Sequence, residues 1–398
     1  MYRCLIIFSE ATKTIQYMLY VAIFLVGFWV LISIYLLICS RKIKYLNAVE
    51  PRLAHEPSLA IVIAVRNEEN DLAEALETMC ELDYKNYRLI VVDDRSTDST
   101  PVILSQFVKK YPNLTIIRID ELPPGWLGKN HALYRGYMAS TEEWILFTDA
   151  DIRYQPDTLK KAVQYCISNK LDHLTVLPNV HSRSSFFNSI MDTFKIMLEA
   201  KLKPWDTLNP KSKSYFGVGA FNLVKRKAYE KAGTHVRIAL RPDDDLKLGQ
   251  CIKMSGFKQE VLYGDKQLEL EWYTSVRAFI KGLMKNTFST VDYNFGKILL
   301  LCFLTFLFFV LPLPLLLFAG GAVEKMLAIV MVVFQVLLFV LKRGMHGVWW
   351  YALMIPVAGS IMIYIMLKSA VMTIQQGGIY WRDSFYSLEE LKQQKGKL

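Results

Sequence analysis

The sequence lacks the glycine-rich patterns by which two large protein classes bind nucleotides. Neither GxGxxG nor GxxxxGK[ST] is present, so dinucleotide-binding and P-loop functions have no phosphate cradle. The chain also has no CxxC pair, no internal repeat and no low-complexity tract. Scattered cysteines without such spacing indicate neither a zinc site nor a disulfide framework, and they suit a reducing compartment. They are Cys4, Cys39, Cys80, Cys166, Cys251 and Cys302.

Long apolar runs, in contrast, are abundant. Hydrophobic residues make up 53% of the 398 residues, and they concentrate towards the two ends of the chain. Residues 15–39 form an uncharged run that is long enough to cross a hydrocarbon core of ~30 Å as a helix. This run is too long for a signal-peptide core, and no cleavage site follows it. The basic cluster Arg41, Lys42 and Lys44 that does follow should stay in the cytoplasm.

Further apolar runs at about 298–320, 326–341 and 347–371 predict a multi-pass protein of the cell membrane. We expect an N-terminal transmembrane helix with its basic flank at 1–44 and a cytoplasmic globular domain at 45–271. An interfacial helix at 272–297, a C-terminal transmembrane region at 298–371 and a tail at 372–398 would follow. Because spans are present, the net charge of +10 indicates an anionic membrane surface as partner rather than nucleic acid.

The globular part alternates strand-like and helix-like segments. Short β-rich apolar runs occur at 58–65, 87–94, 114–119 and 143–151, and segments with helical periodicity separate them. This alternation predicts an α/β domain with a mostly parallel central sheet. Ligands bind beyond the carboxyl ends of such strands, so the polar groups at 66–69, 93–94 and 149–151 should face one crevice.

The sequence FTDADIRY places Asp149 and Asp151 directly after a buried strand. Two carboxylates at this spacing suit a hard divalent cation, Mg²⁺ or Mn²⁺, that neutralises charge on a leaving diphosphate. The alternative is a solvated turn, because aspartate favours turns. The segment VVDDRSTDST, which contains Asp93 and Asp94, has the same ambiguity, because its polar residues can simply cap the next helix.

Two further segments carry charged groups before helices. In PPGWLGKNHAL, Lys129 precedes a helical segment, where it suits phosphate oxygens or is one surface lysine among many. In RPDDDLKLGQ, the acidic run that contains Asp244 and Asp245 is either an N-terminal cap or the source of a general base.

The segment WYTSVRAFIKGLMKNTFS (272–289) is amphipathic when it is written as a helix. Its apolar side suits the membrane surface just before the next span, and Arg277, Lys281 and Lys285 form an adjoining basic strip. Residues 184–203 are a weaker candidate for the same role. Either segment is alternatively an ordinary helix that faces the core.

These motifs, in this order, resemble the membrane-bound family 2 glycosyltransferases with the GT-A nucleotide-sugar-binding fold. The resemblance runs from SLAIVIAVRNEE to GGIYWRDSFYSLEEL. It is closest to the hopanoid-associated and carotenoid-type lipid glycosyltransferases, through PPGWLGKNHAL, FTDADIRYQPDTL, VGAFNLVKRKAYEKAGTH and GLMKN. The QxxRW motif of processive synthases is absent, which argues against polymerisation. KAGTH replaces a double glycine before the histidine, which affects only the acceptor side.

The resemblance implies a role for each matching position. Asp245 would be the general base with support from Asp244, and Asp151 would hold the metal with Asp149. The donor would contact Ala64, Asn67, Glu68, Asp93, Asp94, Lys129 and Asp149. Lys285, Asn286, Trp381 and Arg382 would act as gating or diphosphate contacts at the membrane face.

The expected activity is therefore inverting sugar transfer from a UDP-sugar to a lipid hydroxyl in the bilayer, with Mg²⁺ or Mn²⁺ as cofactor. A polyprenyl-phosphate sugar synthase and a non-catalytic nucleotide-sugar-binding scaffold are the alternatives. One conflict concerns topology, because four full spans would put the tail outside, away from the crevice. Pro312, Pro314, Pro356 and Gly359 interrupt two runs, so one segment is expected to be re-entrant or interfacial, with the tail in the cytoplasm.

Overall fold

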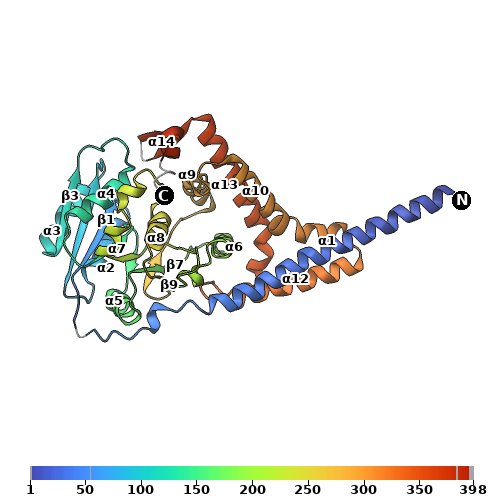
Figure 1. Ribbon diagram of the computed structural model, residues 1–398, viewed down its shortest axis with the longest axis horizontal. Helices are drawn as coiled ribbons and strands as arrows, with labels where there is room; N and C mark the ends of the chain where they lie inside the picture. The colour runs from blue at the N-terminus through green and yellow to red at the C-terminus, as the bar shows by residue number, and fades with distance from the viewer. Residues whose placement is uncertain (1, 54, 382–383, 394–398) are drawn as a thin grey trace.

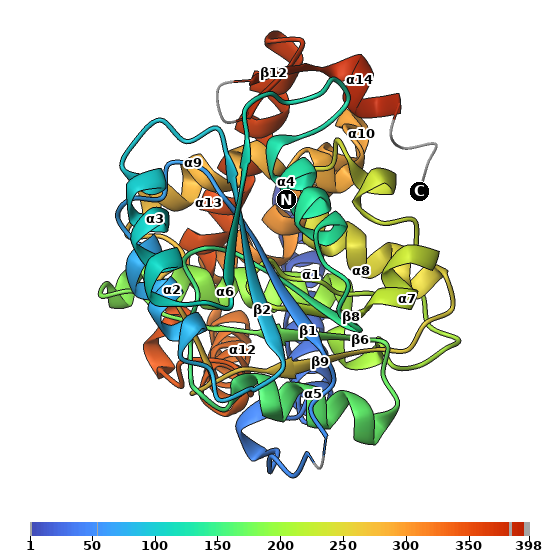
Figure 2. The same cartoon turned by 90° about the vertical axis from the view of Figure 1, so that its left-hand side faces the viewer.

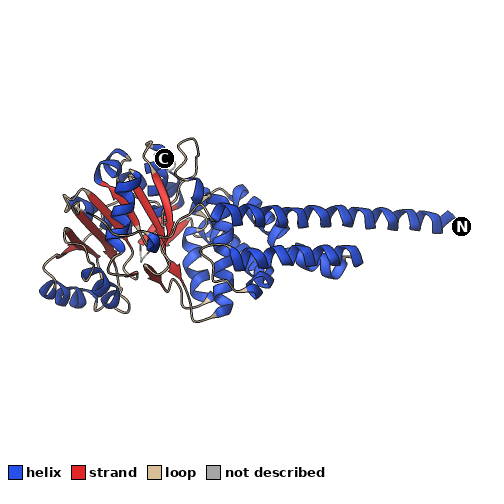
Figure 3. Cartoon of the chain, turned by 90° about the horizontal axis from the view of Figure 1, so that it is seen from below, coloured by secondary structure: helices blue, strands red, loops and turns tan. Residues whose placement is uncertain are grey.

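The computed structural model describes residues 2–53, 55–381 and 384–393. An α/β domain forms one end of the molecule, and long helices project from it on one side (Figures 1 and 3). The helix near the N-terminus, α1 (Tyr2–Ser40), and the later helix α12 (Ala322–Leu341) lie side by side in this projection.

The α/β domain is built on a seven-stranded sheet with the order β3-β2-β1-β4-β8-β6-β9. Four neighbouring strands are parallel, as the sequence predicts: β1 (Leu59–Val65), β2 (Tyr87–Asp94), β3 (Leu114–Ile119) and β4 (Trp144–Thr148). The antiparallel β8 (Asn222–Lys225) separates them from β6 (His173–Leu177) and β9 (Gln259–Tyr263), which are parallel to each other. The sheet is therefore mixed and mostly parallel (Figure 2).

Both faces of the sheet are buried, and β1 shows why its sequence is continuously apolar. Ile61 and Ile63 belong to one core cluster, whereas Ala60 and Val62 belong to the cluster on the opposite face. A strand covered on both sides needs apolar residues at every position instead of an alternating pattern. The helices of the domain are α2 (Leu72–Cys80), α3 (Thr100–Lys110), α4 (Gly128–Met138), α5 (Thr158–Asn169), α7 (Arg226–Lys231) and α8 (Asp244–Met254).

A small second sheet continues the domain towards the projecting helices. It contains β5 (Arg153–Tyr154), β10 (Leu268–Leu270) and β7 (Asn179–Val180). Trp272, two residues after β10, packs against Phe194 of α6 (Ser185–Leu202) and Phe279 of α9 (Val276–Asn286). Short 3₁₀ turns complete the domain at η1 (Leu46–Ala48), η2 (Pro204–Asp206), η3 (His235–Ile238) and η4 (Ser289–Val291).

The helix expected at 272–289 begins only at Val276, because the Ser275 hydroxyl caps it by accepting from the Ala278 N–H. Its apolar side packs into the core: Phe279 is fully buried, and its ring lies against those of Phe194 and Trp272. Its basic strip is exposed. Helix α6 is also largely buried, so the core-facing alternative describes the apolar faces of both helices.

Three helices in the described residues are long and apolar enough to cross a membrane: Gln16–Ser40 within α1, Ala322–Leu341, and Trp349–Gln375. The last contains the turn η7 (Trp349–Met354) and α13 (Ile355–Gln375). A fourth segment is bent at its start, because Val276–Val291 and Phe295–Val310 meet at 116°. It continues through α10 (Phe295–Thr305), η5 (Phe306–Val310), α11 (Pro312–Pro314) and η6 (Leu315–Ala319).

Helix α13 differs in direction from α1 and α12. In Figure 1 it runs steeply across the base of the projecting pair, and its far end reaches the C-terminal elements. These are β11 (Gly378–Trp381), β12 (Ser384–Ser387) and α14 (Leu388–Gln393). Ile379, Tyr386 and Leu391 pack in one apolar cluster with Leu127 and Leu240 of the α/β domain. The described part of the tail therefore lies against the α/β domain.

Candidate active site

The carboxyl ends of β1 and β2 are joined by side chain–backbone hydrogen bonds. Asn67 follows β1 in a left-handed conformation (φ 55°), and its Oδ1 accepts from the Thr97 N–H at 2.8 Å. Asp93, at the end of β2, is buried and accepts from the Ser96 N–H at 3.0 Å. Ala64 is buried in β1, and the Glu68 N–H donates to Thr100 at 2.9 Å.

Asp94 connects this edge to the start of α4. Its carboxylate accepts from Arg95 Nε at 2.8 Å. A Cβ at Gly128 would lie 2.1 Å from Asp94 Oδ2, so only glycine lets the first turn of α4 approach so closely. The next residue, Lys129, is thereby held beside the strand ends.

Lys129 lies among carboxylates that come from separate segments of the chain. Its Nζ is 2.9 Å from Asp149 Oδ1 and 3.6 Å from Asp244 Oδ1. Burial alone would lower the pKa of Lys129, but the charges of Asp149 and Asp244 raise it above its ordinary value. The lysine therefore remains charged and bridges the strand-end and helix-start carboxylates.

Asp244 and Asp245 form the first turn of α8 and differ in what they contact. Burial raises the pKa of Asp244 to about 7, although Lys129 opposes the shift. Burial also raises the pKa of Asp245, whose Oδ2 accepts from the Gly219 N–H at 2.8 Å. Its Oδ1 accepts from the Leu246 N–H at 2.7 Å, so two backbone groups fix the carboxylate.

Asp149 and Asp151 suit a hard cation in their chemistry. Burial and then the charge of Asp149 raise the pKa of Asp151 to about 7. Asp151 Oδ1 is buried and finds no hydrogen-bond partner among the described residues. That part of the chain contains no group of three or more metal-ligating side chains. Mg²⁺ commonly takes only one or two carboxylates and completes its coordination with substrate phosphates and water, so the pair still fits.

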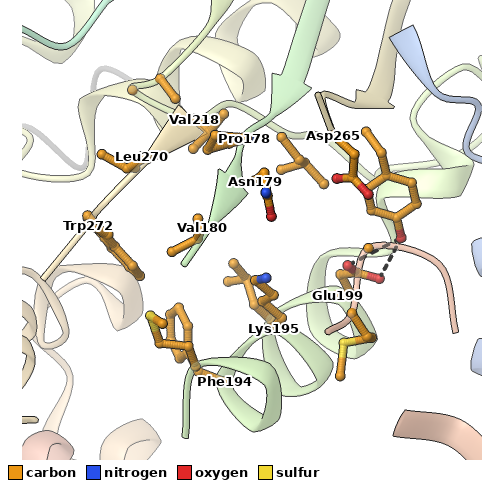
Figure 4. A pocket seen from close by; sticks show the side chains of 18 of the residues that line it. Pro178, Asn179, Val180, Phe194, Lys195, Glu199, Val218, Asp265, Leu270 and Trp272 are labelled. Carbon is orange, nitrogen blue, oxygen red and sulfur yellow. Dashed lines mark hydrogen bonds between the residues drawn. The ribbon is translucent and has the colours of Figure 1, made fainter. Parts of the chain in front are cut away.

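Two cavities meet at Asp149 and Asp245. The larger has an empty volume of about 1100 Å³, which includes space open to solvent, and Asp149, Gly219 and Asp245 are among the residues that line it. The smaller contains about 240 Å³ and is lined by the same three residues together with Lys129 and Asp244. Asp245 therefore lines both cavities. Figure 4 shows the larger cavity.

Gly219 is a site residue that motif reasoning did not single out. Its N–H binds Asp245, and its carbonyl accepts from the Asp149 N–H at 2.9 Å. A Cβ here would lie 2.2 Å from Asp149 Oδ2. The segment VGAF, quoted above only for its resemblance, was the available signal.

Arg241 is a second residue that the motifs do not single out, although it lies two positions before Asp243, the first residue of the acidic run. Its side chain is 1% exposed and donates twice to Asp243, from Nε at 2.9 Å and Nη2 at 3.0 Å. It also donates to Asp292 at 3.2 Å and to the Ser289 carbonyl at 2.9 Å. The start of α8 is thus tied to the turn η4 that follows α9.

The expected membrane-face contacts are only partly described, because Arg382 lies outside the described residues. Trp381 packs at the apolar cluster that contains Leu127, and its Nε1 is buried without a hydrogen-bond partner in the described chain. Burial raises the pKa of Tyr386 in the same hairpin, and the charges of Arg95 and Asp94 also act on it. Lys285 is exposed and Asn286 half-buried at the end of α9.

The sequence of this chain is similar to those of known glycosyltransferases. Residues 60–233 match the model for glycosyl transferase family 2. The beta-monoglucosyldiacylglycerol synthase of Nostoc sp. is 27% identical over 234 residues, which cover 56% of this chain and 47% of the relative. The 4,4'-diaponeurosporenoate glycosyltransferase of Staphylococcus haemolyticus is 22% identical over 58% of this chain and 63% of its own length. The chain thus spans about half the length of the first of these curated relatives and somewhat less than two thirds of the second.

Among solved structures, the mannosyltransferase PcManGT from Pyrobaculum calidifontis in complex with GDP-Man and Mn²⁺ has a TM-score of 0.55 and 18% identity. The match covers 90% of this chain and 99% of that one. This likeness shows the fold, so the expected GT-A-like architecture with a mostly parallel central sheet is confirmed. The expected likeness to lipid- and carotenoid-type enzymes is also confirmed by the curated relatives.

Proposed function

We propose that this chain, which contains a family 2 glycosyltransferase domain, transfers a sugar from a nucleotide-sugar to a hydroxyl group of a membrane lipid. One observation carries the proposal. Asp149, after β4, and Asp245, at the start of α8, contact the same residue, Gly219, and line the same large cavity. A donor held at Asp149 and an acceptor in the cavity would therefore meet beside Asp245.

Asp245 is the proposed general base. A carboxylate with a raised pKa is a better proton acceptor near neutral pH than one at its ordinary value. Its two backbone hydrogen bonds orient it, so that it takes the proton of the acceptor hydroxyl as the oxygen attacks the anomeric carbon. The attack comes from the side opposite the leaving nucleotide, which inverts the configuration at that carbon. Asp244 supports the base by holding Lys129.

The donor side is proposed to use the strand-end residues. Asn67 and Asp93, with Ala64, Glu68 and Asp94 around them, would hold the nucleoside, for which we propose uridine. Lys129 would approach the diphosphate. Asp151 and Asp149 would hold Mg²⁺ or Mn²⁺, which supplies positive charge that stabilises the leaving diphosphate. The buried, unpartnered oxygen of Asp151 in the described residues supports this assignment.

The charges around the large cavity favour a hydroxyl acceptor over a phosphate acceptor. Four carboxylates and one lysine line it in the described chain: Asp149, Glu199, Asp245, Asp265 and Lys195. Lys129 pairs with Asp149, and Lys342 pairs with Glu199. The negative charge that an acceptor phosphate would meet therefore comes mainly from Asp245 and Asp265, whereas a hydroxyl meets acceptors for its proton. A polyprenyl-phosphate acceptor is already ionised and needs no general base, so Asp245 would have no catalytic role. A scaffold that only binds nucleotide-sugar would not need the base at all.

The arrangement of the helices supports a membrane placement with three crossings. We propose that α1, the segment 295–319 and α12 cross the bilayer, while α13 lies along its surface beside α6 and α9. Three crossings leave the α/β domain and the tail on the same side, which the basic cluster after α1 makes the cytoplasm. In intact cells, a cysteine introduced by Lys392→Cys should not react with a membrane-impermeant maleimide. It should react once the membrane has been permeabilised, because the reagent then reaches the cytoplasmic face.

The function is tested with purified protein, a total lipid extract and a panel of UDP- and GDP-sugars, by measuring nucleoside diphosphate release and labelled glycolipid. Asp245→Asn and Asp151→Ala should each abolish glycolipid formation. Asp245→Asn should still bind the nucleotide in calorimetry. Retained turnover in Asp245→Asn would remove this residue as the base, and a phosphate-linked product would replace the proposed acceptor with the alternative one.

A further inference from the structure

The large cavity has two unlike walls. Figure 4 shows Val180, Val218, Leu270 and Trp272 on one side, with Phe194 below them. On the other side lie Glu199 and Asp265, while Asn179 from above and Lys195 from below lie between the two groups, and His346 also lines the cavity. An amphiphilic chamber of this kind is suited to a molecule with an apolar body and a polar head.

His346 is held in one orientation by a buried partner. Its Nδ1 lies 2.8 Å from Asp192 Oδ1, and its backbone N–H donates to Asp192 Oδ2 at 3.2 Å. The Asp192 side chain is fully buried, and Lys195 Nζ lies 3.5 Å from the same oxygen. Because a carboxylate accepts the proton of Nδ1, the neutral ring presents Nε2 as an acceptor, and the protonated ring presents it as a donor.

Nε2 of His346 is buried and has no hydrogen-bond partner among the described residues. A buried polar atom without a partner costs stability, and His346 is one of the residues that line the cavity, so a polar group that enters the cavity is the candidate partner for Nε2. Lys195 adds donors to the same wall, and Figure 4 shows Lys195 from α6 and Asn179 from β7 extending into the cavity from opposite sides. The wall therefore offers both donors and acceptors.

The charged side chains around the cavity indicate whether the entering polar group is anionic or neutral. Lys195 is balanced by Asp192, and Glu199 is balanced by the buried Lys342 at 2.8 Å. Asp265 remains, and burial raises its pKa, which Lys195 and His346 partly oppose. An anionic head would add charge without a spare cation in this part of the described structure. Hydroxyl groups both donate and accept, so they match this set without adding charge.

We propose that His346, Lys195 and Asn179 form a second polar subsite that binds a further hydroxyl of a neutral, polyhydroxylated lipid headgroup. The subsite rests on the proposed function, because it holds the acceptor whose other hydroxyl is presented to Asp245. The apolar wall contacts the part of the lipid next to the head. His346 acts in binding and specificity, and it does not touch the reacting atoms.

The test compares three lipids that have the same C16 chain and differ in the head: hexadecanol, 1-palmitoylglycerol and 1-palmitoyl lysophosphatidate. Labelled sugar transfer gives kcat/KM for each. We expect 1-palmitoylglycerol to exceed hexadecanol by roughly tenfold to a hundredfold, the range for one hydrogen bond to a charged or strongly polar partner, and lysophosphatidate to be the poorest.

Two variants of His346 separate the subsite from a merely structural role. The amide introduced by His346→Asn retains a side-chain donor for Asp192 and removes the polar group at the position of Nε2. His346→Gln keeps a polar group near the position of Nε2 and loses the side-chain hydrogen bond to Asp192. We expect His346→Asn to lower kcat/KM for 1-palmitoylglycerol towards the value for hexadecanol, with the loss mainly in KM. His346→Gln should retain most of the preference. Lys195→Met should weaken it.

The outcomes are distinct. Equal kcat/KM for hexadecanol and 1-palmitoylglycerol in the wild type, with transfer intact, overturns the subsite and leaves the proposed function standing. A preference for lysophosphatidate that Lys195→Met removes overturns the neutral headgroup. If no lipid and no nucleotide-sugar in the panel gives transfer, the proposed function fails and the subsite fails with it.

Discussion

Gly219→Ala offers a sharp test of the active-site geometry. The new Cβ would stand 2.2 Å from Asp149 Oδ2 and 2.9 Å from Asp149 Cγ. An ordinary carbon–oxygen contact needs more than about 3 Å, so the carboxylate has to move by about 1 Å or the 217–219 segment has to retreat from Asp245. Either movement separates the two carboxylates that the proposed mechanism places together.

The magnitude follows from the displacement. Misplacing a catalytic group by about 1 Å costs ~100-fold in rate, equivalent to about 2.7 kcal/mol of activation free energy. Overpacking of this kind costs about 1–3 kcal/mol of folding stability, which lowers the melting temperature without preventing folding.

The assay measures glycolipid formation and the melting temperature of the same preparation in detergent. Gly27→Ala is the matched control, because no heavy atom of the described chain outside the adjoining residues and the backbone of its own helix lies within 4 Å of its added Cβ. It should retain full activity. A Gly219→Ala protein that folds and transfers sugar at the wild-type rate would refute the assignment of Asp149 and Asp245 to one reaction centre.

Three further predictions concern the framework of the site. Arg241→Met should cost about 3–5 kcal/mol of stability, because it leaves buried Asp243 without its cation; a loss below about 1 kcal/mol in denaturant titration would contradict this. Lys342→Met should destabilise the protein by a similar amount, and adding Glu199→Gln should restore much of the loss, because the remaining charge is then removed. A double variant that is less stable than Lys342→Met would disprove the coupling. Burial lowers the pKa of His173 to about 4, below its ordinary value of 6.5, so its contribution is complete above pH 6.5. Roughly 3 kcal/mol should be lost as the pH falls towards 4. His173→Gln should show a smaller difference between unfolding at pH 7.5 and pH 4.5, and an identical difference would count against the buried neutral ring.

Much of the catalytic edge was predictable because its residues follow strands. A continuous apolar run such as LAIVIAV predicts a strand that is buried on both faces, and parallel strands bring their carboxyl ends to one edge. Asn67, Asp93 and Asp149 could therefore be grouped from the sequence alone, whereas Lys129 lies in the first turn of a helix and was assigned to the donor side only through the family resemblance. Their proposed roles are still predictions, because grouping does not identify what each one binds.

The residues at the polar side of the large cavity could not be grouped from the sequence in this way. Asp192 and His346 are 154 residues apart, and neither belongs to a motif. Their contact depends on how α6 packs against the loop after α12, and no local pattern specifies that packing. Helix α13 illustrates the same limit, because its composition is that of a span, while its direction depends on its neighbours.

The loop 344–346 begins three residues after the end of α12 and forms part of the cavity wall. Under the proposed function, the loop that follows a membrane-spanning helix thus forms one side of the substrate cavity. Reactant and product would then enter and leave sideways within the lipid phase, without passing through water. Turnover would obey surface-dilution kinetics: adding inert lipid at constant total acceptor should slow the enzyme, whereas changing the water volume should not.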